Sequence, residues 1–254
     1  MREHIFSGIY PDFAVADLQS YGEGFDSEEA VARAVQKLQE ARTSPKSNIP
    51  IGLRTCSLPA FIAAQNSHLR PLSILDFGGS VGFGYWTLLQ SAPNVKIEKY
   101  DIVEGQRLCQ AGSELFADLD TPVRFHARIS EDCSWDWAYV NSTIQYIDDY
   151  PDLLRSLLNC CDWILLDDVP AGSNPDFVSI QRYYSSTVPH RFFCESNLTK
   201  LFAELGLNIH YQGIYFGSIL GKIDGYPMDN FPASHRITFS RTYLLETQRR
   251  ISVR

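Results

Sequence analysis

The stretch SILDFGGSVGFGYW, residues 73–86, is the part of the sequence that decides the fold. A short apolar run ends at Asp76 and is followed by four glycines within seven residues. Glycine loses more conformational freedom on folding than any other residue, so this density is unfavourable unless the backbone must turn sharply or let another group approach closely. The stretch therefore predicts a strand, a tight glycine loop and a helix, with a ligand beside the loop.

The sequence after residue 70 alternates between strand and helix patterns. Short apolar runs predict five strands, at residues 73–77, 95–104, 123–129, 137–141 and 163–167. Helical patterns end near residue 91, cover residues 107–117, begin at residue 151 and cover residues 198–205. Two last strands, at residues 207–216 and 235–246, follow each other without a helix. This order predicts an α/β fold with a doubly wound sheet that ends in an antiparallel hairpin. A ligand is expected at the C-terminal strand ends.

The first 70 residues have a different pattern. Residues 26–41 predict an amphipathic helix with Asp26 and Glu29 as a capping box, residues 43–52 are a Pro/Ser-rich break, and residues 55–67 predict another helix. We interpret residues 1–70 as a helical N-terminal extension or cap, and residues 71–254 as the main domain. The extension is expected either to close the active site or to form a homodimer.

The composition excludes several classes of protein. The formal charge is −8, the pI is about 5.2, and no run of Lys or Arg suggests a nucleic-acid partner. The start of the chain lacks a signal-peptide pattern, and the apolar runs are too short to cross a bilayer. Six cysteines without CxxC or zinc-finger spacing predict reduced thiols in a cytoplasmic protein.

Three interpretations of the glycine loop compete. Gly78, Gly82 and Gly84 fit the GxxxGxG of short-chain dehydrogenases, but no Tyr lies four residues before a Lys, and Asp76 would repel a pyrophosphate. A turn without a ligand would leave the glycine density unexplained. S-adenosylmethionine carries positive charge beside which an acid is favourable, so we favour this cofactor. Its predicted binding residues in the loop are Asp76, Gly78, Gly79, Ser80 and Gly82.

Strand ends further along the chain supply the other predicted cofactor contacts. Glu104 ends the second strand, where a carboxylate can accept both ribose hydroxyls. Ile129 and Ser130 follow the third strand and are expected at the adenine edge. Asn141 and Ser142 end the fourth strand beside the methyl group; the alternative is that they only cap a helix.

The acceptor side is predicted from polar and aromatic residues. Residues 170–196 are interpreted as a lid over the acceptor, and the candidate acceptor contacts are Gln145, Tyr146, Gln181, Tyr183 and Tyr184. The candidate general base is His190, with Arg191 as a contact for an anionic group. Asp167 and Asp168 offer a competing base. A catalytic metal is not predicted, because Asn141 is a weaker ligand for a hard cation than Asp.

Four stretches carry a resemblance to a known family. LDFGGSVGFGYW, KYDIVE, WDWAYVNSTIQYIDDYPDLL and WILLDDVP resemble, in this order, motif I, the ribose-binding acid, the fourth-strand motif and the fifth strand of class I S-adenosylmethionine-dependent methyltransferases. The resemblance implies a Rossmann-like seven-stranded sheet with strand order 3-2-1-4-5-7-6 and an antiparallel last strand. More narrowly, FSGIYPDFAVADLQSYGEGFDSEEAVARAV, DFGG, IVE and DFVSIQ resemble a methyltransferase family of bacterial O-antigen and surface polysaccharide gene clusters. Asp168 departs from it, because a basic residue is expected there.

These inferences predict a methyltransferase that O-methylates a saccharide or sugar precursor in surface polysaccharide biosynthesis. The expected partner is a small-molecule or saccharide acceptor. Two alternatives stay open: a dinucleotide-dependent oxidoreductase, and an inactive methyltransferase-like binding protein.

Overall fold

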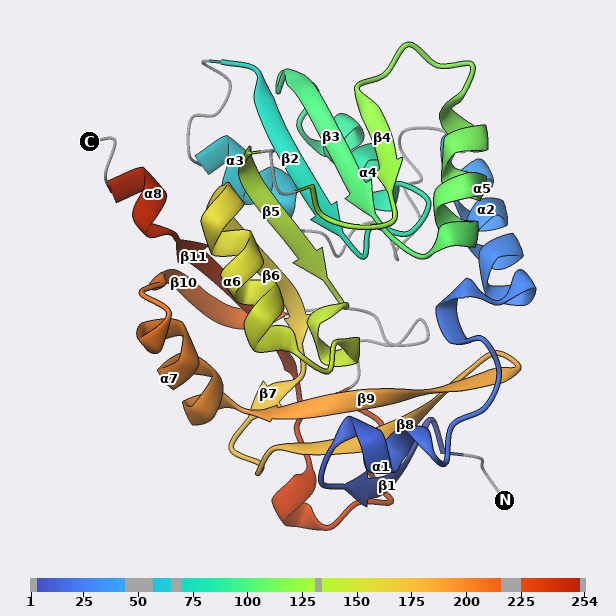
Figure 1. The fold of residues 1–254 in the computed structure, drawn as a ribbon, viewed down its shortest axis with the longest axis vertical. Helices are drawn as coiled ribbons and strands as arrows, with labels where there is room; N and C mark the ends of the chain where they lie inside the picture. Colours follow the sequence, from blue (N-terminus) through green and yellow to red (C-terminus); the bar gives the residue numbers. More distant parts are fainter. Residues whose placement is uncertain (1–3, 44–56, 65–69, 131–133, 216–224, 252–254) are drawn as a thin grey trace.

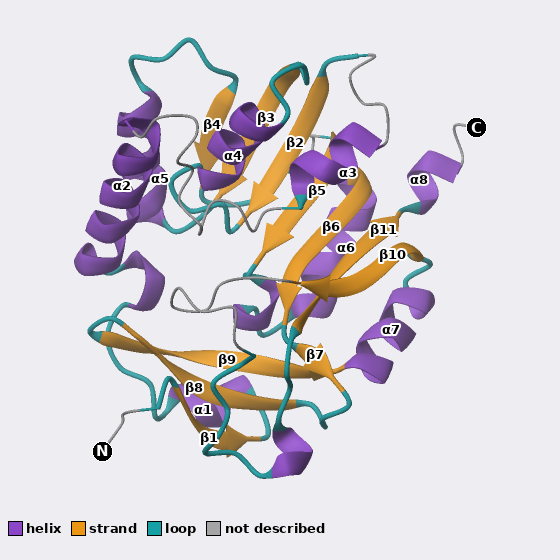
Figure 2. Ribbon diagram, turned by 180° about the vertical axis from the view of Figure 1, so that it is seen from behind, coloured by secondary structure: helices purple, strands orange, loops and turns teal. Residues whose placement is uncertain are grey.

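The computed structural model describes residues 4–43, 57–64, 70–130, 134–215 and 225–251, which form a mixed α/β fold (Figures 1 and 2). Among these residues the larger sheet has seven strands in the order β10–β11–β6–β5–β2–β3–β4. Their bounds are β2 Leu72–Phe77, β3 Ile97–Val103, β4 Val123–His126, β5 Trp135–Asn141, β6 Cys161–Val169, β10 Asn208–Tyr215 and β11 Ser240–Glu246.

The pairing of these strands confirms the predicted topology. Neighbours from β4 to β6 are parallel, whereas β11 pairs antiparallel with both β6 and β10. This is the predicted order 3-2-1-4-5-7-6 with its antiparallel last strand. The central strands are continuous apolar runs because helices cover both faces, and Ile74, Leu75 and Ile164 are fully buried.

Helices cover the two faces of the larger sheet. One face packs against α2 Glu28–Thr43, α3 Leu58–Ala64, α4 Phe83–Ser91 and α5 Gln106–Phe116. The other face packs against α6 Tyr150–Cys160 and α7 Glu195–Glu204. Since β-strand side chains alternate between the faces, Ile74 belongs to the first apolar cluster and Leu75 to the second. The short helix α8 Gln248–Ile251 follows β11.

A second, smaller sheet corrects two predictions. Its order is β1–β8–β9–β7, with β1 Phe6–Tyr10, β7 Ala171–Gly172, β8 Phe177–Tyr183 and β9 Ser186–Cys194. The predicted lid over residues 170–196 is therefore mostly a β-hairpin, and the N-terminal extension contributes a strand as well as helices. Phe6, Phe177 and Phe192 hold the sheet together in an aromatic cluster. The smaller sheet lies beyond the carboxyl ends of the parallel strands (Figures 1 and 2).

Local end signals explain where the helices begin and stop. Asp149 caps α6 by accepting a hydrogen bond from the Asp152 amide, with proline in the first turn. Gly206 has a φ of +71°, the left-handed conformation that follows the end of α7. Ser27 caps α2, so the predicted capping role of Asp26 within its own helix is wrong. Three short segments, α1 Phe13–Asp17, η1 Gly24–Asp26 and η5 Ile144–Tyr146, connect the larger elements, and η6 Ala233–His235 precedes β11.

Within the described residues, no helix is both long and apolar enough to cross a membrane. The described cysteines Cys109, Cys160, Cys161 and Cys194 are free thiols. Cys56 and Cys133, most of the predicted break at residues 43–52, and both ends of the predicted helix at residues 55–67 lie outside the described residues.

Candidate active site

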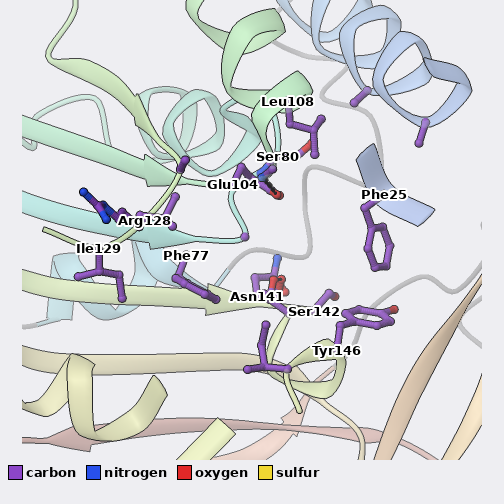
Figure 3. A pocket seen from close by; sticks show the side chains of 18 of the residues that line it. Phe25, Phe77, Ser80, Glu104, Leu108, Arg128, Ile129, Asn141, Ser142 and Tyr146 are labelled. Carbon is purple, nitrogen blue, oxygen red and sulfur yellow. Dashed lines mark hydrogen bonds between the residues drawn. The ribbon is translucent and has the colours of Figure 1, made fainter. Parts of the chain in front are cut away.

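A cavity of about 840 Å³ lies at the carboxyl ends of the parallel strands, where the ligand was predicted. Its walls come from the loop after β2, the ends of β3, β4 and β5, the N-terminal segment and the smaller sheet. Figure 3 shows Glu104 and Asn141 on one side of the cavity, and the rings of Phe25 and Tyr146 facing each other at the other.

Of the four glycines in the loop after β2, Gly78 is the one that lines this cavity. Its φ is +77°, and a Cβ placed on it would lie 2.2 Å from Thr143 Oγ1, a neighbouring lining residue. Both its conformation and its contacts therefore require glycine. Ser80, two residues later, also lines the cavity.

The other glycines of the loop make room for the protein's own side chains. A Cβ on Gly79 or Gly84 would lie 2.5 Å from the Asp76 side chain, and one on Gly82 would lie 2.9 Å from the Phe116 ring. Gly82 has a φ of +100° at the start of α4. Gly79 and Gly82, which were predicted to contact the cofactor, do not line the cavity, so their contact with it stays a prediction.

Asp76, a predicted contact of the cofactor, does not line the cavity. The side chain is buried, and Oδ2 accepts a hydrogen bond from the Tyr100 hydroxyl at 2.7 Å. Burial raises the pKa of Asp76 to about 7, while the bond from Tyr100 opposes the shift. The Asp76 carboxylate therefore packs closely against Gly79 and Gly84 of the loop and is held there by Tyr100.

Glu104 lies at the tip of β3 and lines the cavity, as predicted. Its Oε1 accepts the Ser80 amide and its Oε2 accepts the Gly105 amide, both at 3.0 Å. Burial raises the pKa of Glu104, and the two backbone amides lower it in part. These amides hold the carboxylate in one orientation, and each of its oxygens retains a lone pair for a ligand.

The end of β5 brings Asn141, Ser142 and Thr143 to the cavity. The Oδ1 atom of Asn141 is buried and has no hydrogen-bond partner among the described residues. A buried polar atom without a partner costs about 1–3 kcal/mol. The Ser142 hydroxyl donates to Asp168 Oδ2 at the end of the neighbouring strand β6. Both predicted β5 residues therefore lie in the site, and the helix-capping alternative does not describe them.

Aromatic side chains form the far wall. Phe25 packs edge-on against Tyr146, with ring centroids 4.6 Å apart, and lies 4.5 Å from the Tyr183 ring; all three line the cavity. The Tyr146 hydroxyl donates to Gln181 Oε1 at 2.7 Å, so Gln181 acts as a support behind the wall. Tyr184 packs on Tyr183 but does not line the cavity.

Gln145 was predicted to contact the acceptor, but its side chain is buried and does not line the cavity. Its Oε1 atom has no hydrogen-bond partner among the described residues. Of the two residues predicted at the adenine edge, Ile129 lines the cavity, together with its neighbour Arg128, whereas Ser130 does not.

The three predicted catalytic residues do not line the cavity. His190 is buried among the rings of Phe6, Tyr146 and Phe192, at centroid distances of 4.8, 5.2 and 4.6 Å. Burial lowers the pKa of His190 to about 3. The imidazole is therefore a neutral part of the aromatic core, and its predicted role as general base is not supported by this position.

Arg191 and Asp167 are occupied by structural contacts. The Arg191 guanidinium lies over the Phe13 and Tyr150 rings and pairs with Asp148, so it is not available for an anionic acceptor. Asp167 is fully buried. Its carboxylate accepts hydrogen bonds from Thr242 Oγ1 and from the amide and hydroxyl of Ser57.

The N-terminal segment contributes lining residues that the sequence reasoning missed, namely Phe25, Ala30 and Ala34. The Asp26 carboxylate explains their position, because it accepts hydrogen bonds from the Arg107 and Leu108 amides at the start of α5. An acidic side chain is favourable at a helix N-terminus. The available signal was an acid at the start of the helix predicted at residues 26–41. That signal assigned Asp26 to its own helix, whereas the structure places it at the start of α5.

The described residues contain no group of three or more His, Cys, Asp or Glu side chains placed to hold a metal ion. The polar groups of the cavity suit an organic cofactor: a carboxylate that is fixed by backbone amides and an amide oxygen without a partner among the described residues, both of them acceptors, beside a glycine that leaves space.

No protein-family model matches the chain, and no curated protein matches it. Solved structures do. Magnesium protoporphyrin IX methyltransferase from Synechocystis PCC 6803 with bound S-adenosylhomocysteine is 11% identical, with a TM-score of 0.55 over 92% of this chain and 98% of that one. A S-adenosylmethionine-dependent methyltransferase from Clostridium acetobutylicum ATCC 824 is 14% identical, with a TM-score of 0.54 over 86% and 98%.

A S-adenosylmethionine-dependent methyltransferase from Leishmania major is similar over 96% of this chain and 98% of its own, with 13% identity and a TM-score of 0.53. At these identities the comparison shows the fold, which is that of class I S-adenosylmethionine-dependent methyltransferases.

Proposed function

We propose that this protein binds S-adenosylmethionine and transfers its methyl group to an oxygen of a saccharide or sugar precursor. The observation that carries the cofactor assignment is Asn141, which lines the cavity and whose buried Oδ1 has no hydrogen-bond partner among the described residues. A ligand that donates a hydrogen bond there removes the cost of that unpaired atom. Glu104 offers fixed acceptors for ribose hydroxyls on the next strand but one.

The residues present fit the cofactor in type and position. Glu104 would hold the ribose, Asn141 the donor groups of the methionyl part, Gly78 would allow close approach, and Ile129 would contact the adenine. When bound, S-adenosylmethionine supplies an activated methyl group. What remains for the chain is to orient the acceptor, exclude water and take up a proton.

The acceptor side supports an uncharged ring. Phe25, Tyr146 and Tyr183 offer aromatic faces, and Arg191 is withdrawn into its own contacts. The face of a sugar ring is apolar enough to pack on such rings while its hydroxyls bond to polar side chains. A role in surface polysaccharide biosynthesis and a cytoplasmic location rest on the resemblance and on the cysteine pattern.

We also propose that the N-terminal extension closes the cavity, because Phe25, Ala30 and Ala34 form part of its wall. The homodimer stays a prediction. Sedimentation of the full chain measures it directly.

Calorimetry of the full chain with S-adenosylmethionine, S-adenosylhomocysteine, NAD⁺ and NADP⁺ tests the cofactor. We expect binding of the two sulfur nucleosides and none of the dinucleotides, whereas dinucleotide binding alone would establish the oxidoreductase instead. The matched variant Asn141→Leu fills a similar volume without the amide oxygen, and it should weaken S-adenosylhomocysteine binding by roughly tenfold or more.

Transfer of a labelled methyl group to a panel of free sugars, sugar phosphates and nucleotide sugars then identifies the acceptor. We expect label on an oxygen of a neutral sugar unit. Cofactor binding without transfer to any member of the panel would favour the inactive binding protein.

A further inference from the structure

Two residues at neighbouring strand ends form a hydrogen-bonded pair. The sequence suggested Ser142 as a cofactor contact and Asp168 as a competing base, but not that the two are bonded to each other. Ser142 follows β5 and lines the cavity, and Asp168 lies near the end of β6. The Ser142 hydroxyl donates to Asp168 Oδ2. The pair therefore connects the cavity to a carboxylate that lies just behind it.

Both members of the pair have backbone conformations that are rare for residues other than glycine. The φ of Ser142 is +51° and that of Asp168 is +54°. Such conformations cost about 1–3 kcal/mol each and are retained where the surrounding structure holds them. Here they turn the two side chains toward each other at the edge of the site.

The other oxygen of Asp168 has structural partners. Oδ1 accepts hydrogen bonds from the Ser240 hydroxyl and, at 3.4 Å, from the Tyr226 hydroxyl. Among the described residues, the titratable groups that interact with Asp168 are Tyr226 and Tyr146. Burial raises the pKa of both tyrosines, so they stay protonated and neutral in the working range of pH.

The remaining acids and bases near the cavity are less suited to take a proton. Glu104 lines it, but both its oxygens accept backbone amides, and it is the proposed ribose contact. Asp76 and Asp167 do not line it, and neither do their hydrogen-bond partners Tyr100, Ser57 and Thr242, whereas the partner of Asp168, Ser142, does. His190 does not line it and is enclosed by aromatic rings. Burial raises the pKa of Tyr183 to about 12, so its hydroxyl holds its proton.

We propose that the acceptor hydroxyl loses its proton to Asp168 through Ser142. As the acceptor oxygen forms its bond to the methyl carbon, the carbon–sulfur bond breaks and leaves its electron pair on sulfur. The acceptor proton passes to Ser142 Oγ, and the Ser142 proton passes to Asp168 Oδ2. The carboxylate ends neutral, and the positive charge of the methyl donor is consumed, so charge and atoms balance. Ser142 is the group that contacts the acceptor, and Asp168 is the final proton holder.

This inference rests on the proposed function, and a spectroscopic titration separates the two. The C=O stretch of protonated Asp168 is read as the infrared difference between the wild type and Asp168→Asn, across pH, in complexes with S-adenosylmethionine and with S-adenosylhomocysteine. If Ser142 and Asp168 face the reacting centre, the positive charge of S-adenosylmethionine lowers the titration midpoint of Asp168 by about one pH unit relative to the complex with S-adenosylhomocysteine. Equal midpoints in two formed complexes would overturn the inference. Failure of both ligands to bind would overturn the proposed function itself.

Two serine variants distinguish a relay from a purely structural carboxylate. Ser142→Ala and Ser240→Ala each remove one hydroxyl donor from Asp168, but Ser240 does not line the cavity. Both should raise the midpoint of Asp168, because each donor stabilises the carboxylate. With the acceptor from the methyl-transfer screen, Ser142→Ala should lower kcat by about 100-fold or more and Ser240→Ala by less than about tenfold. Equal losses in kcat would show that Asp168 is only structural.

Discussion

Replacing Glu104 by glutamine tests the proposed cofactor site at a residue that the sequence predicts there and that lines the cavity. The carboxylate accepts the Ser80 and Gly105 amides, one on each oxygen. Glutamine keeps one oxygen, but its NH₂ group must then face the other amide, so one buried N–H loses its partner. That loss costs about 1–3 kcal/mol of folding stability.

The effect on binding follows from the charge. A hydrogen bond to a charged group contributes about 1.5–3 kcal/mol, so losing the carboxylate should raise the Kd for S-adenosylhomocysteine roughly 10- to 150-fold. Because burial raises the pKa of Glu104, wild-type affinity should also fall as the pH is lowered and the carboxylate takes up a proton. The Glu104→Gln variant has no such group, and its affinity should not follow pH in this way.

Calorimetry at several pH values and urea denaturation provide the two readouts. Glu98→Gln is the matched control, because it removes the same charge from an exposed residue of the same strand, β3. We expect wild-type affinity in the control. If Glu104→Gln binds as tightly as the control at all pH values, Glu104 does not contact the ligand and the placement of the ribose is wrong.

Three further variants test the corrected roles. Burial raises the pKa of Asp76 from its ordinary value of 3.8 to about 7, so the fold favours the protonated carboxyl. Relative to Asp76→Asn, the wild type should therefore lose about 4 kcal/mol of unfolding free energy between pH 4 and pH 8. The same pH dependence of the unfolding free energy in both proteins, measured by urea denaturation, would contradict this. Burial lowers the pKa of His190 from 6.5 to about 3, so the fold favours the neutral imidazole. Relative to His190→Phe, the wild type should lose up to about 5 kcal/mol of unfolding free energy as the pH falls from 6.5 to 3. Methyl transfer by the variant should persist, and its loss would show that His190 is the base. Asp26→Ala removes the cap of α5, which should lower the unfolding free energy by about 0.5–2 kcal/mol. It should also speed the dissociation of S-adenosylhomocysteine in stopped-flow measurements, because Asp26 holds Phe25 at the cavity. An unchanged dissociation rate would show that Phe25 does not retain the ligand.

The larger sheet could be predicted because its strands have a simple cause. Strands buried on both faces must be apolar throughout, and WILLDD and SILDF carry that signal without help from the rest of the chain. The smaller sheet has no such signal. The strand FSGIY is short and contains a glycine. The β8–β9 hairpin mixes aromatic with polar residues, because the smaller sheet contributes both to the wall of the cavity and to its own aromatic cluster. Its pairing joins residue 6 to residue 181, a separation that local patterns do not contain.

The site residues divide along the same line. Glu104, Asn141 and Ser142 could be predicted because the tip of a parallel strand in this fold always lies at the ligand edge. The direction of a side chain within one turn of the tip is decided by its neighbours. Asp76 turns toward Tyr100 because a glycine stands at each position where a Cβ would meet its carboxylate. The glycines were correctly recognised as a place of close approach, but the approaching group is in large part the protein itself.

The change of the proton acceptor from His190 to Asp168 follows from the same distinction. His190 attracted attention by its chemical type, in a segment that was expected to be a polar loop, whereas pairing of β8 with β9 turns its ring inward among aromatic residues. Asp168 was offered with Asp167 as a competing base, and it also departs from the pattern of the family that the sequence resembles. Yet an acid at this strand end, held by hydroxyls on both oxygens and reached from the cavity through one of them, is what removal of a hydroxyl proton requires. A basic residue at this position could not accept that proton while charged, whereas a carboxylate can.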